Sequence, residues 1–116
     1  MSTDERVRAL RATQELRHLT DAQLGALLPH LDELCVAAGT RLAVEGRLCH
    51  QFLVVAKGSL EMCRHGRAAT MGPGGALGWQ AMRERGVNDA TVTALSDAHV
   101  LVMSHEQFRA VESLRT

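Results

Sequence analysis

Glycines punctuate the middle of the chain at short intervals and separate runs that are rich in β-branched and aliphatic residues. Between residues 33 and 74 these runs are ELCVAAG, TRLAVEG, HQFLVVAKG, SLEMCRHG and RAATMGPG. Strands of about five residues, with a turn every eight to twelve, predict an antiparallel barrel or sandwich and not alternating strand–helix units. We expect positive backbone φ at four corners, namely Gly39, Gly46, Gly58 and Gly66.

Helix-capping signals lie on both sides of this β-rich region. A capping box pairs Ser or Thr with Glu or Gln three residues later. The chain has this spacing at Ser2–Glu5, at Thr20–Gln23 and at Ser104–Gln107. The three pairs predict a helical lead-in over residues 1–31 and a closing helix over residues 104–116.

The length of 116 residues favours a single domain. A chain of this size buries about two-thirds of its unfolded surface, which supports one core and not two. We place a β-roll over residues 32–103, with its last two strands at about 90–95 and 98–103. The sequence thus predicts a mainly β fold with helices at both ends.

Charge and hydropathy exclude several classes of partner. Thirteen basic and thirteen acidic side chains cancel, so no summed field draws the protein to nucleic acid or to an anionic membrane. The acidic start of the chain is unlike a signal peptide, and no apolar run approaches the ~18 residues of a membrane span. We expect a cytoplasmic protein with no nucleic-acid or membrane partner.

The cysteines are Cys35, Cys49 and Cys63, an odd number at fourteen-residue intervals. This spacing suits neither a disulfide framework nor paired zinc knuckles. Soft ligands adjoin at Cys49–His50 and around His65, but the CxxC or HxxxH pair that usually marks a metal site is missing. We expect reduced thiols at buried strand positions, no metal site, and a surface or helix-end position for His99.

The sequence gives no sign of catalysis. Its serines lack the GxSxG context of a nucleophile elbow, and its adjacent carboxylates fall in predicted loops or helix ends. We therefore expect no enzymatic activity.

Several segments, taken in order, carry a family resemblance. They are LTDAQLGALLPHL, AAG (37–39), VEG (44–46), FLVVAKGSLEM (52–62), MGPGGALG (71–78) and DATVTALSDAHVLVMSHEQF (89–108). From about residue 16 to 111 the chain resembles the cyclic-nucleotide-binding domain of the catabolite-activator and protein-kinase-regulatory type. The resemblance implies an antiparallel jelly-roll-like β-barrel with flanking helices, and a phosphate-binding cassette over residues 72–91.

The family's cassette is a short helical turn followed by a loop. Free N–H groups at the start of the turn face the cyclic phosphate, an arginine neutralises it, and a glutamate accepts a hydrogen bond from the ribose 2′-hydroxyl. The resemblance places five uncharged residues of this chain on matching positions: Gly78, Ala81, Met82, Ala90 and Thr91.

The charged positions of the cassette are substituted in this chain. Trp79 stands where the glutamate belongs, Asn88 where the arginine belongs, and Asp89 at the small position beside it. Burying a phosphate without its cation costs about 2–5 kcal/mol, and an unpaired ribose hydroxyl adds ~1–3 kcal/mol. We expect weak or no binding of cyclic AMP or cyclic GMP, and no cofactor.

Two alternatives stay open at the cassette. Trp79, which precedes Gln80 in the cassette, has two interpretations. We favour an indole that plugs the cavity or makes a surface contact. In the alternative it forms a platform for a flat ligand, to which Asn88 supplies amide hydrogen bonds. If Arg83 or Arg85 swings onto the phosphate, the chain is instead a genuine cyclic-nucleotide sensor.

The expected function is that of a regulatory or sensor module. It acts through protein contacts or a small molecule of other chemistry, beside an effector domain in cis or an effector protein in trans. In the family, ligand draws the cassette inward and the closing helix follows, so we expect the signal to leave through residues 104–115. Oligomeric state stays open.

Overall fold

The computed structural model of the chain describes residues 2–115, with side chains as far as Ser113. The helices are α1 (Thr3–Ala12), α2 (Asp21–Leu27), the 3₁₀ helix η1 (Leu28–His30), α3 (Trp79–Glu84) and α4 (His105–Arg115). The strands are β1 (Asp32–Val36), β2 (Arg41–Ala43), β3 (Gln51–Lys57), β4 (Leu60–Arg64), β5 (Arg67–Met71), β6 (Ala76–Leu77), β7 (Thr91–Ala94) and β8 (Ala98–Ser104).

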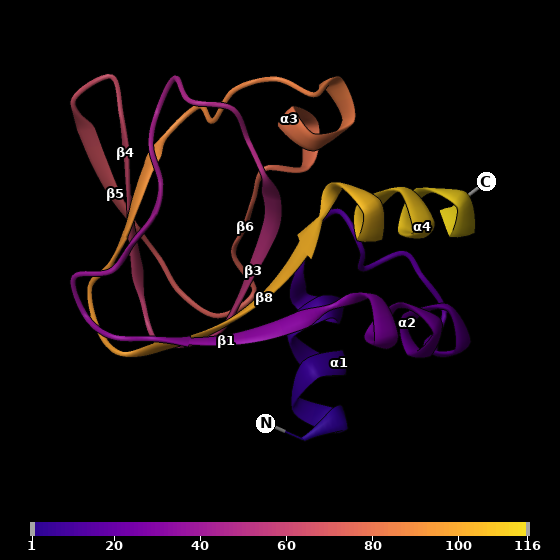
Figure 1. Cartoon of the computed structure of the whole chain (residues 1–116). Coiled ribbons are helices and arrows are strands. Elements are labelled where there is room, and N and C mark those ends of the chain that lie inside the picture. The colour runs from indigo at the N-terminus through magenta and orange to yellow at the C-terminus, as the bar shows by residue number, and fades with distance from the viewer. Residues whose placement is uncertain (1, 116) are drawn as a thin grey trace.

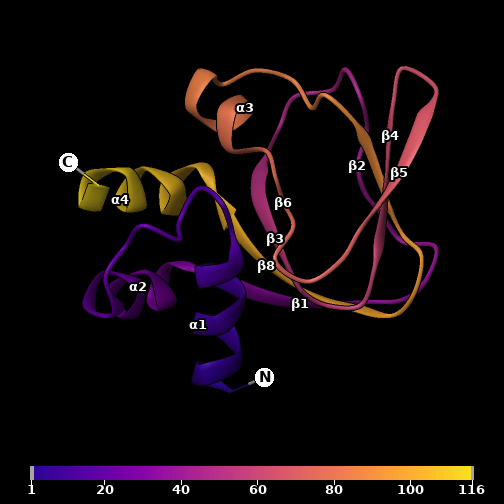
Figure 2. The ribbon, with the colours of Figure 1, turned by 180° about the vertical axis from the view of Figure 1, so that it is seen from behind.

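The strands form two four-stranded antiparallel sheets, in the orders β1-β8-β3-β6 and β2-β7-β4-β5. The helices gather at one end of the molecule beside the first sheet, and the β4–β5 hairpin lies at the other end (Figure 1). The view from behind shows the same division (Figure 2). No helix within residues 2–115 combines the length and the apolarity that a membrane crossing needs.

The prediction of a closed barrel is not confirmed, and the sandwich named with it describes the sheets better. Hydrogen bonds link strands within each sheet, whereas side chains from the two facing sheets share one hydrophobic cluster. The short strand β6, which pairs with β3, was not predicted. Its two residues lie inside the glycine-rich stretch, where no alternating pattern can develop.

All three predicted capping pairs are confirmed. In each, a backbone N–H that has no partner inside its helix donates to a side-chain oxygen three residues earlier. These bonds run from Glu5 N to Ser2 Oγ at 3.2 Å, from Gln23 N to Thr20 Oγ1 at 3.2 Å, and from Gln107 N to Ser104 Oγ at 3.3 Å.

The helix that begins at the Thr20–Gln23 capping pair ends before residue 31, the predicted end of the helical lead-in. α2 stops at Leu27, and η1 continues the chain for one 3₁₀ turn. Pro29 lies in that turn and has no N–H to donate to the carbonyl four residues before it, so the α-helical ladder ends there.

The central strands β3 and β8 are buried on both faces, which explains the continuous apolar run FLVV. Alternate side chains of a strand point to opposite faces. Leu53 and Val55 enter the cluster between the sheets, whereas Phe52 and Val54 enter the cluster beneath the helices. β8 divides in the same way, with Val100 and Val102 between the sheets and Leu101 and Met103 beneath the helices.

The predicted glycine corners are confirmed, with φ of 90° at Gly39, 85° at Gly46, 88° at Gly58 and 78° at Gly66. At Gly58 the surroundings add a second constraint. A Cβ there would lie 2.5 Å from the carbonyl oxygen of Asp97, whereas one at Gly66 would have no heavy atom within 4 Å.

We expect Gly58→Ala to destabilise the fold more than Gly66→Ala does. Both substitutions force an L residue into the left-handed region, which costs about 1–2 kcal/mol of unfolding free energy. Only Gly58→Ala also pushes a methyl group against Asp97 and Ala98 at the start of β8. Urea denaturation followed by circular dichroism measures the difference. Equal losses of unfolding free energy would contradict the close approach at Gly58.

Candidate functional site

A hollow of about 430 Å³ opens between β2, the segment that leads into β3, and the start of α3. Its wall includes residues 41–44 and, next to them, residues 88–90. Five residues that the sequence assigned to the cassette line it, namely Gly78, Ala81, Asn88, Asp89 and Ala90. The fold therefore brings the predicted turn and the predicted loop together around one cavity.

Gly78 sets the position of the helical turn. It has φ of 95° immediately before the first residue of α3, and it lines the hollow. A Cβ on Gly78 would lie 2.8 Å from the carbonyl oxygen of Gln51 and 3.3 Å from Cys49 Sγ. Only glycine allows α3 to begin so close to the start of β3.

The indole of Trp79 lies in the core and is not part of the hollow's lining. It is 9% exposed and makes edge-to-face contacts with Phe52 and Phe108, at centroid distances of 5.1 and 4.8 Å. Trp79 and Met82 are three residues apart, so they share the buried face of α3. This position differs from all three predicted roles of Trp79, namely the cavity plug, the surface contact and the ligand platform. The side chain connects α3 to β3 and α4.

Asn88 and Asp89 line the hollow, and both have partners in the protein. The Asn88 amide donates to the carbonyl oxygen of Val44 at 3.1 Å, and its backbone N–H donates to Arg47 O at 2.8 Å. The Asp89 carboxylate pairs with Arg64 of β4 at 2.8 Å. These contacts fasten the loop to the segment after β2 and to β4, and they partly neutralise the acidic group.

Arg83, in α3, and Arg85, at the C-cap of that helix, lie outside the hollow's lining. Arg83 pairs with Glu112 of α4, with 3.4 Å between Nε and Oε2. Arg85 is exposed and closes α3 with φ of 53°. In this arrangement the predicted charge partners of a phosphate face α4 and solvent.

The remaining cassette residues also serve the local structure. Gln80 is exposed and donates to Glu84 at 2.6 Å across one helical turn. Thr91 Oγ1 accepts a hydrogen bond from the Glu45 backbone N–H at 3.0 Å. Neither Gln80 nor Thr91 is among the residues that line the hollow.

Sequence reasoning missed the cations that do line the hollow. Arg41 of β2 and Arg47 stand in its wall together with His50. The ion pairs formed among the described residues involve neither Arg41 nor Arg47. The sequence identifies TRLAVEGR as a strand and its turn. It does not show that this segment lines the cavity, because that depends on the pairing of β2 with β7.

The cysteines occupy three different environments, and only part of the prediction about them is correct. All three are free, but Cys35 is exposed, Cys63 is half-buried, and the buried Cys49 precedes β3 instead of lying in a strand. Burial raises the pKa of the Cys49 thiol, and the charge of Asp89 adds a small further rise. The hydrogen bond to Gln51 O lowers the pKa by less than burial raises it.

Comparisons with known proteins agree on one family. A family model described as "Cyclic nucleotide-binding domain" matches residues 33–113. Among solved structures, the regulatory domain of Toxoplasma gondii PKA with cAMP superposes with a TM-score of 0.83 at 25% identity, over 93% of this chain and 43% of that one. A search of curated proteins found no match.

Two bacterial regulators have the same fold. The N-terminal domain of a Streptomyces coelicolor transcriptional regulator gives a TM-score of 0.80 at 27% identity, over 92% of this chain and 79% of that one. Thermus thermophilus catabolite activator protein gives 0.74 at 22% identity, over 83% and 48%. This chain spans less than half the length of the Toxoplasma and Thermus structures.

We expect thiol reactivity in the order Cys35, Cys63, Cys49. At neutral pH a raised pKa lowers the thiolate fraction of Cys49, and burial blocks access to it, whereas Cys35 is open to reagent. Timed alkylation with a maleimide, read by peptide mass spectrometry, gives the order, with urea-unfolded protein as the control in which all three react. Equal rates in the folded protein would be inconsistent with these environments.

Trp79→Ala is expected to lower the unfolding free energy by about 3–5 kcal/mol, because it empties a large buried volume between α3, β3 and α4. Trp79→Phe keeps an aromatic ring there, so its loss should be smaller. Circular dichroism is the appropriate probe, since both variants lack the chain's single tryptophan. A near-neutral Trp79→Ala would contradict the burial of the indole.

Proposed function

Because this chain belongs to the cyclic nucleotide-binding domain family, we propose that it is a regulatory domain with weak or no binding of cyclic AMP and cyclic GMP. One observation carries this proposal. The cavity is present, but the arginine position of the cassette holds an amide that bonds to Val44 O, and the glutamate position holds an indole in the core. A phosphate bound against this turn meets neither of the family's charged partners.

The size of the effect follows from the missing charge. Leaving a buried phosphate without its cation costs about 2–5 kcal/mol, which corresponds to roughly 30- to several thousand-fold in dissociation constant. Asp89 also lines the cavity, and its pairing with Arg64 reduces, without removing, its repulsion of an anion.

The route by which such a domain signals runs from α3 to α4. Trp79 contacts Phe108, and Arg83 pairs with Glu112, so a buried aromatic contact and an ion pair join the cassette helix to the closing helix. A displacement of either helix disturbs both contacts. We propose that a partner, either an effector domain in cis or an effector protein in trans, is regulated through α4.

A second candidate function rests on Arg41 and Arg47. These guanidinium groups line the cavity, and neither takes part in the ion pairs found among residues 2–113. They can supply positive charge to an anionic small molecule from the strand and corner that adjoin the cassette loop. In this alternative the chain is a genuine sensor, of a cyclic nucleotide or another anion, and its arginines are Arg41 and Arg47 instead of the predicted Arg83 or Arg85.

The proposal includes a non-enzymatic, cytoplasmic protein. The free cysteines suit a reducing compartment. The one carboxylate in the cavity wall is engaged by Arg64, which argues against its use as a general base. Balanced charge argues against a nucleic-acid or membrane partner.

Calorimetric titration of the whole chain with cyclic AMP and cyclic GMP tests the proposal. We expect dissociation constants well above about 1 μM, since the binding free energy lacks the phosphate–guanidinium pair. Micromolar or tighter binding by the unmodified chain would refute weak binding. Loss of that affinity in Arg41→Gln, Arg47→Gln would then establish the second candidate.

A gain-of-binding variant tests the cassette assignment itself. Asn88→Arg combined with Asp89→Ser should strengthen cyclic AMP binding by about 30-fold or more, because it restores the cation and removes the carboxylate. Asn88→Ala with Asp89→Ser is the matched control: it also lacks the carboxylate but adds no guanidinium, so its gain should be much smaller. Trp79 is left unchanged because a glutamate there would bury a charge between Phe52 and Phe108. Equal affinities for the two variants would overturn the assignment.

A further inference from the structure

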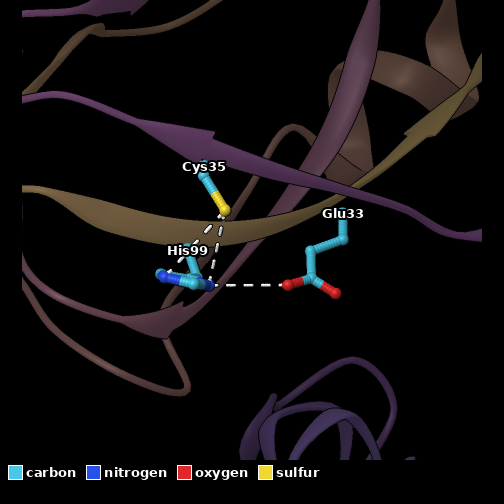
Figure 3. A group of neighbouring side chains, drawn as sticks. All are labelled: Glu33, Cys35 and His99. Atoms are coloured by element: carbon cyan, nitrogen blue, oxygen red, sulfur yellow. Dashed lines mark hydrogen bonds and ion pairs between the residues drawn. The ribbon is translucent and has the colours of Figure 1, made fainter. Parts of the chain in front are cut away.

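Three side chains of different chemistry converge on the first sheet, away from the hollow (Figure 3). Cys35 of β1 lies directly opposite His99 of β8 in the antiparallel ladder. Glu33 is two residues before Cys35, so its side chain points to the same face of the sheet. The pairing of β1 with β8 therefore places a thiol, an imidazole and a carboxylate side by side.

The donor atoms of these residues lie close together. Cys35 Sγ is 3.6 Å from His99 Nδ1, and His99 Nδ1 is 3.5 Å from Glu33 Oε1. One ligand atom from each of the three residues lies within 4.8 Å of the other two. The site is open to solvent, because Cys35 is exposed and its two neighbours are half-buried.

We propose that Glu33, Cys35 and His99 form a binding site for a divalent transition-metal ion of the Zn²⁺ class. Thiolate, imidazole and carboxylate are the ligands that zinc takes in proteins, and the soft sulfur disfavours Mg²⁺ and Ca²⁺. Three protein ligands leave a fourth tetrahedral position to water. The site is thus of the open type, with an ion that can exchange with solution.

The spacing of the ligand atoms fits a tetrahedral ion. With Zn–S of about 2.3 Å and Zn–N or Zn–O of about 2.0–2.1 Å, tetrahedral angles place neighbouring ligand atoms about 3.3–3.6 Å apart. The two measured separations, 3.6 Å and 3.5 Å, agree with these values. Binding therefore requires only small side-chain adjustments, chiefly to bring the sulfur and the carboxylate together.

The same geometry disfavours a nucleophilic triad. In such a triad the cysteine faces one imidazole nitrogen, and the carboxylate orients the ring through the other. Here Cys35 Sγ and Glu33 Oε1 both lie nearest Nδ1 of His99, and Nε2 is farther from the sulfur, at 4.0 Å. With both groups at the same nitrogen, the carboxylate does not orient the ring through its other nitrogen as a triad requires.

Neighbouring charges hold the carboxylate in place. Arg6 of α1 donates to Glu33 Oε2 at 3.1 Å, which leaves Oε1 toward His99. Burial raises the pKa of Glu33, but the hydrogen bonds from Arg6 and His99 together with nearby positive charge outweigh it, so the pKa lies below its usual value. The carboxylate is ionised at neutral pH. Lys57, opposite His99 on β3, pairs with Glu5 at 2.9 Å, which offsets its charge.

Cobalt titration of reduced, tag-free protein tests the proposal. A thiolate bound to Co²⁺ gives a charge-transfer absorption in the near ultraviolet, and Zn²⁺ displaces the cobalt and removes it. We expect this band to saturate at one equivalent, to be absent in Cys35→Ser, and to need at least about tenfold more cobalt in His99→Gln or Glu33→Gln. Cys63→Ser is the matched control and should behave like the unmodified chain.

Three results would overturn the site: no charge-transfer band in the unmodified chain, an unchanged band in Cys35→Ser, or loss of the band in Cys63→Ser alone. The last result would indicate that cobalt binds at Cys63 and His65 instead. Circular dichroism checks that each variant is folded. A second measurement needs no variant, because saturating Zn²⁺ should slow alkylation of Cys35 and leave the rate at Cys63 unchanged. Equal rates with and without zinc at Cys35 also count against the site.

Discussion

Burial of β3 and β8 on both faces is the constraint on which the rest of the structure depends. One face of these strands meets the second sheet, and the other meets α1, α2, α3 and α4. A strand with apolar side chains in both directions needs a layer on each side. The helices are therefore part of the core, and Phe52 of β3 provides the surface on which Trp79 and Phe108 meet.

This arrangement explains how the cassette keeps its shape with substituted residues. The turn still begins at Gly78, since only a glycine fits so near Gln51, and α3 is held by its buried face. Asn88 and Asp89 bond to neighbouring strands. Positions that the resemblance assigns to a nucleotide site make contacts within the domain here, and the arginines that line the cavity are Arg41 and Arg47.

The cavity and the proposed metal site occupy different parts of the molecule. The cavity lies between β2, the entry to β3 and α3, and the Glu33–Cys35–His99 group lies on paired strands of the first sheet beside Arg6 of α1. Both α1 and α4 pack on the same sheet, so the proposed ion at β1 and β8 and the proposed partner at α4 would act on one connected layer. The two proposals remain separable, because they share no residue.

Interactions between near neighbours in the chain were determined by the sequence alone. The capping pairs lie three residues apart, the glycine corners depend on local φ, and the apolar runs indicate the strands. These features were therefore predictable, and so was the family resemblance that rests on them. Tertiary structure decided the rest. The direction of Trp79 depends on where α4 packs, the charge of the cavity depends on the pairing of β2, and Cys35 meets His99 only through the β1–β8 register. That register joins Cys35 and His99, which lie 64 positions apart in the chain, and no local pattern contains such a pairing.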